Sequence, residues 1–95
     1  MGVLENAEIE QRLSAVPEWR RGEDGTSISR EVKLEDFAGA IALVDRVAVV
    51  AEEANHHPDI LIHGWNKVRL TLSTHSEGGL TEADFALAAR IDGLL

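Results

Sequence analysis

The sequence predicts an α+β domain in which a four-stranded antiparallel sheet carries helices packed on one face. Apolar residues recur every three or four positions in the segments 6–16, 36–55 and 81–91, as in amphipathic helices. Apolar and polar residues alternate in the segments 26–34 and 67–74, as in half-buried strands. The order helix, strand, strand, helix, strand, strand, helix suits antiparallel hairpins. With 95 residues, the chain has room for a single domain, residues 1–95.

The N-terminal part should form a short helix followed by a hairpin. Asn6 can cap the helix, and Pro17 ends it. Two strands, residues 18–21 and 26–34, then flank a turn at Asp24-Gly25, a pair that readily adopts positive backbone angles. One face of the second strand should be buried, because alternate side chains point to the same face and three of the four on this face are apolar: Ile28, Arg30, Val32 and Leu34.

The longest periodic segment begins at Glu35-Asp36 and runs to about Asn55. Its apolar residues recur at the spacing of one helix face, which should therefore be buried: Phe37, Ile41, Val44, Val47, Ala48 and Ala51. Pro58 disfavours helical backbone at the residue before it, so His57 should turn into an extended conformation. His56 and His57 thus lie at a corner between a helix and a strand.

The C-terminal part should form a second hairpin and a last helix. Residues 59–64 and 67–74 read as strands, and Gly64 suggests a bulge between them. Residues 76–79 should form a flexible loop, after which Thr81 can cap the helix. The side of this helix that should be buried carries four apolar residues: Phe85, Ala88, Ala89 and Ile91.

Composition limits the classes of partner. Seventeen acidic residues against nine basic ones give a formal charge of −8, which opposes binding to nucleic acid and to anionic membranes. The chain has no cysteine, and its charged segment 1–11 lacks the apolar core of a signal peptide, so we expect a cytoplasmic protein. An antiparallel sheet leaves edge strands that a second copy can pair with. We therefore expect a homodimer through a sheet edge, and such dimers can assemble further into tetramers.

The residues best suited to chemistry are three histidines and one carboxylate: His56, His57, His75 and Asp84. Free histidine titrates near pH 6.5, so it can donate or accept a proton around neutrality. His75 follows Thr74 at the end of the longest strand, where a side chain can project into a cleft. Trp65 could stack on a flat heterocycle. This combination predicts a site for proton transfer.

Each of these residues also has a structural interpretation. A corner histidine can cap the last carbonyl groups of the long helix, and His75 can be a surface residue of a loop. Asp84 lies three residues after Thr81 and can complete a capping box. Trp65 can belong to the core or to an interface. A zinc site is a further alternative, although its candidate ligands match no familiar spacing: His56, His57, His63 and His75.

From about Leu13 to Ile91 the sequence resembles the pterin-4a-carbinolamine dehydratases. The resemblance rests on an acidic residue, a His-His-Pro corner, an aromatic residue, a Thr-His pair and a later aspartate. In this sequence these are Glu52, His56-His57-Pro58, Trp65, Thr74-His75 and Asp84. Further segments are similar to the family as well: Trp19, Asp36-Phe37, 66–68, 70–75 and 79–81.

The resemblance implies dehydration of 4a-hydroxytetrahydropterin to quinonoid dihydropterin, which supports tetrahydrobiopterin recycling and needs no metal or bound cofactor. One proton goes to the departing hydroxyl group and another leaves the neighbouring ring nitrogen. The implied catalytic residues are His56, His57 and His75, with His57 as the principal base and His56 or His75 as the acid. Asp84 would orient His75 or hold the pterin. The residues implied to bind or orient the substrate are Pro58, Trp65, Thr74 and Asp84.

One departure from the family pattern comes directly after the corner. Asp59-Ile60 stands where animal members have Glu-Trp, and the stretch to Trp65 is one residue longer. The change affects the wall of the pocket and the assembly surface. The rival hypothesis is a non-catalytic relative that keeps the fold as an assembly or interaction module. The retained imidazoles and carboxylate favour the enzyme, because a bare scaffold has no physical need for them.

Overall fold

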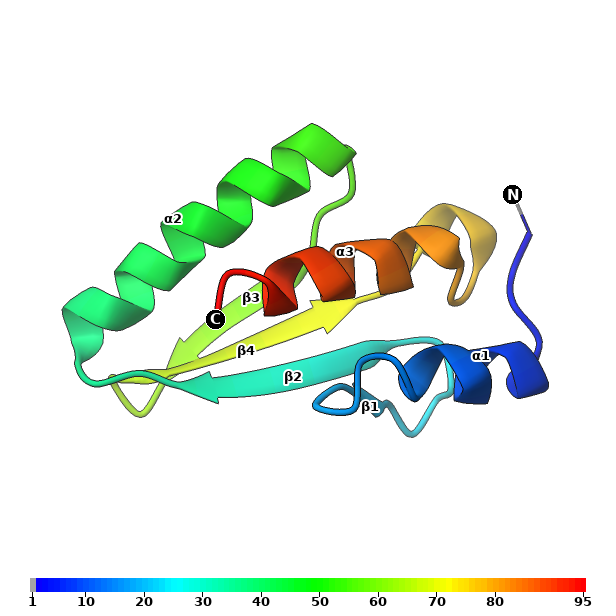
Figure 1. Cartoon of the computed structure of the whole chain (residues 1–95), viewed down its shortest axis with the longest axis horizontal. Coiled ribbons are helices and arrows are strands. Elements are labelled where there is room, and N and C mark those ends of the chain that lie inside the picture. The colour runs from blue at the N-terminus through cyan, green and yellow to red at the C-terminus, as the bar shows by residue number, and fades with distance from the viewer. Residues whose placement is uncertain (1) are drawn as a thin grey trace.

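The computed structural model describes residues 2–95 and contains a four-stranded antiparallel sheet with three α-helices (Figure 1). The helices are α1 (Asn6–Leu13), α2 (Phe37–Ala54) and α3 (Glu82–Asp92), and η1 (His75–Glu77) is a short 3-10 helix. The strands are β1 (Arg20–Arg21), β2 (Ile28–Lys33), β3 (Asp59–His63) and β4 (Lys67–Leu72). Their spatial order is β1-β2-β4-β3, which leaves β3 at one edge. The predicted fold class and order of elements are confirmed.

The two central strands bury one face and expose the other, as the alternation predicts. β2 and β4 pair along their whole length, from Ile28 opposite Leu72 to Lys33 opposite Lys67. Four apolar side chains on the face under the helices are fully buried: Ile28, Val68, Leu70 and Leu72. The side chains on the opposite face of the sheet are polar. Among them, the carboxylate of Glu31 bonds to His63 and to Arg69. The sheet is therefore a one-sided platform for α2 and α3 (Figure 1).

Arg30 is the one cation on the buried face of β2, and α3 neutralises it. Its Nη1 lies 2.6 Å from Oδ1 of Asp92, and the same oxygen accepts a hydrogen bond from the indole of Trp19 at 2.8 Å. Charge-assisted hydrogen bonds of this kind are stronger than neutral ones. Asp92 thus joins the last turn of α3 to the sheet and to the segment before β1.

The long helix α2 begins and ends where the sequence predicts. Oδ1 of Asp36 accepts a hydrogen bond from the backbone N–H of Gly39 at 2.7 Å, which caps the first turn. Asn55 ends the helix in a left-handed conformation with φ of 50°. This ending directs the chain toward His56 and the start of β3.

The face of α2 that packs on the sheet differs in part from the predicted one. Val47 and Ala51 are buried as expected, but Phe37, Ile41 and Ala48 are exposed. The buried residues are Ala40, Leu43, Val47, Val50 and Ala51. Apolar side chains surround most of this helix, so its spacing is compatible with more than one face. Packing selects the face on which Ala40 allows close approach and Leu43 fills the core.

Substituting one residue from each face tests this assignment. Leu43→Ala should lower the free energy of unfolding by about 2–5 kcal/mol, because Leu43 is fully buried and the change leaves a cavity. Ile41→Ala should cost less than ~1 kcal/mol, because that side chain is 40% exposed. Urea unfolding of both variants checks the prediction. Equal costs would contradict the observed packing.

Smaller differences from prediction occur at the helix ends. Glu5, not Asn6, occupies the N-cap position of α1 and makes no side-chain capping hydrogen bond, and the helix ends at Leu13, before Pro17 is reached. The side chain of Asn6 instead accepts a hydrogen bond from Arg21 at 2.9 Å. In α3, Leu87 is buried and Ala89 is exposed, whereas the spacing placed Ala89 on the buried side. Tertiary contacts, which spacing does not reveal, decide both cases.

The expected bulge at Gly64 is instead a turn. All five residues of β3 pair with β4 in one unbroken register, and both Gly64 and Trp65 have positive φ, of 55° and 60°. Residues 75–77, which overlap the flexible loop expected at 76–79, form η1, which is closed by a bridge between Thr74 and Gly79. Within residues 2–95, none of the helices is both long and apolar enough to cross a membrane.

Candidate functional site

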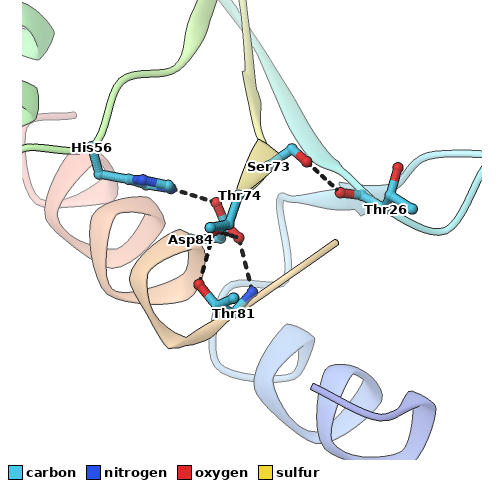
Figure 2. A network of polar contacts seen from close by, with 6 residues as sticks. All are labelled: Thr26, His56, Ser73, Thr74, Thr81 and Asp84. Carbon is cyan, nitrogen blue, oxygen red and sulfur yellow. Dashed lines mark hydrogen bonds and ion pairs between the residues drawn. The ribbon is translucent and has the colours of Figure 1, made fainter. Parts of the chain in front are cut away.

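A buried polar network centres on Asp84 in the first turn of α3 (Figure 2). Oδ1 of this carboxylate lies 2.6 Å from Nε2 of His56. Oδ2 accepts hydrogen bonds from the hydroxyl of Thr74 at 2.8 Å and from the backbone N–H of Thr81 at 2.9 Å. The hydroxyl groups of Thr74 and Thr81 also lie 2.8 Å apart. The network therefore joins α2, β4 and α3 at one point.

Local sequence explains how each member reaches this point. Thr81 precedes α3, and Asp84 lies three residues later, so its side chain returns to the Thr81 N–H as the capping box predicts. Thr74 comes just after the end of β4 and is held by its bridge to Gly79. His56 is next to the left-handed Asn55, and its backbone N–H bonds to the carbonyl of Ala51 at 3.1 Å.

The surroundings of Asp84 are those of a buried carboxylate with several hydrogen-bond donors. The carboxylate is fully buried, and it lies at the N-terminus of a helix, where the backbone dipole stabilises negative charge. Its hydrogen bonds offset the cost of burying that charge. The carboxylate in turn contacts Nε2 of His56 and so orients that imidazole, whose side chain is mostly buried. When Nε2 of His56 faces the carboxylate, Nδ1 is left to exchange a proton.

The other corner histidine lies outside this network. His57 is exposed, and its Nε2 contacts the carboxylate of Glu52 in the last turns of α2. The two rings of the corner therefore have different carboxylate partners, one buried and one at the surface. Pro58 separates this corner from β3 and is half-buried. The corner thus presents one oriented, mostly buried imidazole beside a more accessible one.

His75 borders a hollow of about 380 Å³ at the end of the sheet. The other residues that line it come from the first hairpin, from β3, from β4 and from the segment after β4: Asp24, Thr26, Ser27, Asp59, Thr71, Ser73 and Gly78. The hydroxyl of Ser73 donates to the carbonyl of Thr26 at 2.8 Å and braces one wall (Figure 2). The volume lies in the range of small-molecule sites. His56 and His57 do not line this hollow, although Asp59 lies just beyond their corner.

The structure brings some of the predicted residues together and separates others. His56, Thr74 and Asp84 are in direct contact, and the imidazole that Asp84 contacts is that of His56, not that of His75. Trp65 is 62% exposed in the turn at the far end of β3, so within one chain the length of that strand separates it from the corner. His63 bonds to Glu31 on the open face of the sheet.

Two residues near the site were not among the predicted ones. The Thr81 hydroxyl contacts Thr74, although the sequence suggested only a capping role for Thr81. Asp59 lines the hollow beside His75, and its position directly after the His-His-Pro corner was the available signal. Within residues 2–95, no three histidine, aspartate or glutamate side chains are grouped so that they could hold a metal ion.

A family model matches almost the whole chain. The model described as "Pterin 4 alpha carbinolamine dehydratase" covers residues 2–94. The chain belongs to this family of pterin carbinolamine dehydratases. A protein of Nocardia farcinica that is provisionally named as such a dehydratase is 53% identical over 92 residues, or 97% of this chain and 94% of its own. A similarly named protein of Chloroflexus aggregans is 50% identical, over 100% of this chain and 99% of its own.

Two solved structures of the family are also similar. A Brucella melitensis protein described as a transcriptional coactivator/pterin dehydratase has a TM-score of 0.91 and 32% identity, with 98% of each chain covered. A pterin dehydratase-like protein identified as a RuBisCO assembly factor in the alpha-carboxysome has a TM-score of 0.69 and 31% identity. It covers 81% of this chain and 88% of its own.

Proposed function

We propose that this protein catalyses the dehydration of 4a-hydroxytetrahydropterin to quinonoid dihydropterin and water, with histidines as acid and base. The contact between the buried Asp84 carboxylate and His56 is the main support, because it holds an imidazole in a fixed orientation. The hollow that His75 borders supplies space for a small molecule, and Asp59, which follows the His-His-Pro corner, also lines it. Membership of the pterin carbinolamine dehydratase family supports a pterin as the substrate class.

The reaction requires two proton movements. The bond between ring carbon 4a and its hydroxyl oxygen breaks as that oxygen receives a proton and leaves as water. The neighbouring ring nitrogen loses its proton, and the electron pair of that N–H bond forms the new carbon–nitrogen double bond. We assign His56 as the acid, because Asp84 orients its imidazole and histidine can donate a proton near neutrality. We assign His57 as the base, because it is accessible and Glu52 can stabilise the charge that it acquires.

The alternative function is that of an assembly or interaction module. One observation favours it, namely the similarity to the pterin dehydratase-like RuBisCO assembly factor. That protein matches a smaller share of this chain than the Brucella protein does, with a lower TM-score. The retained His56–Asp84 contact also has no evident use in a module that only holds other proteins.

Turnover distinguishes the two functions. The decay of 4a-hydroxytetrahydropterin is measured by ultraviolet absorbance with the wild-type protein, with His57→Ala, with His75→Ala and in buffer. The enzyme proposal predicts rapid decay with the wild type only and a slower rate for each variant, because each lacks one imidazole. Decay at the buffer rate in all samples would leave the assembly function.

We further propose that the protein forms a homodimer through the free edge of β3. This strand pairs with β4 on one side only, and its side chains include the exposed Ile60 and Leu61. An apolar edge strand is a template for pairing with a second copy, and closing it removes an aggregation hazard. A twofold axis through such an edge would join two sheets into one of eight strands.

A charge on β3 should weaken this dimer. Leu61→Lys should raise the dimer dissociation constant at least ~10-fold, because two ammonium groups would approach each other across the axis. Leu95→Lys is a matched control, since Leu95 is 47% exposed and Leu61 is 49% exposed. Sedimentation velocity over a range of concentrations measures the effect. A strictly monomeric wild type at micromolar concentration would contradict the proposal.

A further inference from the structure

The β3 strand is chemically complementary to itself when two copies run antiparallel. Its sequence is Asp59-Ile60-Leu61-Ile62-His63, with an acid at one end, an imidazole at the other and apolar residues between them. With a twofold axis at Leu61, Asp59 faces the partner's His63, and Ile60 faces the partner's Ile62. Residues opposite each other in an antiparallel pair point to the same face. This register therefore pairs each charge with its complement and each apolar residue with another.

Other registers lose this complementarity. Side chains alternate between faces, so only shifts by an even number of residues keep the helices of both copies on one face of the joined sheet. A shift of two residues in one direction places Asp59 opposite the partner's Leu61. A shift in the other direction places His63 opposite Leu61 and removes Asp59 from the paired segment. The register centred on Leu61 is therefore the favoured one.

Antiparallel pairing of β3 brings opposite ends of the strand together across the interface. The His57-Pro58 corner precedes β3, and Trp65 lies in the turn after it. In the register centred on Leu61, His63 of one copy lies opposite Asp59 of the other. The turn that follows His63 and carries Trp65 therefore comes to the same end of the paired strands as the partner's His57-Pro58 corner. Residues that are distant within one chain thus lie at the same end of the interface in the dimer.

The conformation of Trp65 suits such a role. A bulky residue with positive φ is uncommon, and here φ is 60°. The turn is held by the N–H of Asn66, which bonds to the Gly64 carbonyl at 2.7 Å, and by the Asn66 side chain, which donates to the Leu34 carbonyl at 3.0 Å. Asn66 is itself buried. The exposed side chain of Trp65 is therefore carried by a turn that hydrogen bonds hold in place.

We infer that the catalytic site is shared between two copies, and that the partner's Trp65 forms a wall of the pterin site beside His57. The flat bicyclic ring of a pterin offers a face on which an indole can stack. The inference rests on the proposed dehydratase function and on the β3 dimer. It explains why a residue that the family pattern places with the site lies far from the corner within one chain.

Mixing two defective variants tests the shared site. Trp65→Ala should lower the rate at low substrate concentration about 10-fold through lost stacking, and His57→Ala should be nearly inactive. After subunit exchange of an equal mixture, one site in each mixed dimer combines an intact His57 with an intact Trp65. Activity should therefore rise to about a quarter of the wild-type value. If both residues acted within one chain, the mixture would retain only about a twentieth.

A second readout does not depend on catalysis. The emission of Trp65 is the difference between the spectra of the wild type and Trp65→Phe, because Trp19 is the other tryptophan of the chain. This emission should shift to shorter wavelength as the concentration rises through dimer formation, and His57→Ala should alter it in the dimer only. If the wild type were inactive but showed both effects, the dehydratase function would be rejected and the contact between Trp65 and the partner's corner would stand. Emission that does not respond to His57→Ala in the dimer would overturn the shared site.

Discussion

His56→Ala should slow the dehydration of 4a-hydroxytetrahydropterin by about 10²–10⁴-fold, the usual contribution of a general acid or base. His56 is the one imidazole that contacts the buried carboxylate, at 2.6 Å. Its removal takes away both the proton donor and the group that Asp84 orients. Initial rates from ultraviolet absorbance, corrected for the decay in buffer, measure the loss.

His63→Ala is the matched control for this variant. His63 also contacts a carboxylate at 2.6 Å, that of Glu31, but on the open face of the sheet. That contact, and after it those with Arg69, lower the pKa of Glu31 below its usual value. The substitution should leave turnover per site within about 2-fold of the wild type when the protein is dimeric. Equal losses in the two histidine variants would contradict a specific role for His56.

Asp84→Asn should impair both turnover and stability. An amide keeps the shape of the side chain but carries no negative charge, so the contact with His56 loses its charged acceptor. We expect turnover to fall about 10²-fold. The free energy of unfolding should fall by ~2 kcal/mol, because Thr74 and Thr81 lose a charged acceptor in a fully buried position.

Thr74→Val separates these two effects. It removes one hydrogen bond to the carboxylate and leaves the charge and its contact with His56 in place. The cost in unfolding free energy should be ~1 kcal/mol or slightly more, with a smaller loss of turnover than in Asp84→Asn. Urea unfolding and initial rates on the same samples provide the comparison. If Asp84→Asn lost stability but kept full activity, the carboxylate would have only a structural role.

Sequence patterns predicted the capping box, the buried face of β2 and the ends of α2, because interactions between residues close in sequence determine these features. The Thr81 to Asp84 capping box is set by four consecutive residues, and the buried parity of β2 is set by alternation along one strand. The ends of α2 are likewise fixed by Asp36 and Asn55. The face of α2 was less predictable, because apolar residues occupy most of its circumference and only packing on the sheet selects among them.

The site was predictable in its members but not in its contacts. The family pattern named His56, His75 and Asp84, yet it suggested His75 as the partner of Asp84. The structure pairs Asp84 with His56, a residue 28 positions away, because the segment after α2 brings His56 beside the first turn of α3 (Figure 2). The location of Trp65 could not be anticipated either, since it depends on where the turn after β3 lies relative to the corner.

The proposed function requires imidazoles from distant stretches of the chain to surround one pterin site. The most direct test is to add a dihydropterin to the dimeric protein and to monitor the imidazole resonances of all four histidines by NMR. We predict that the signals of His56, His57 and His75 shift together with one dissociation constant, while that of His63 does not. Shifts confined to His63, or no shift at saturating ligand, would contradict a shared pterin site.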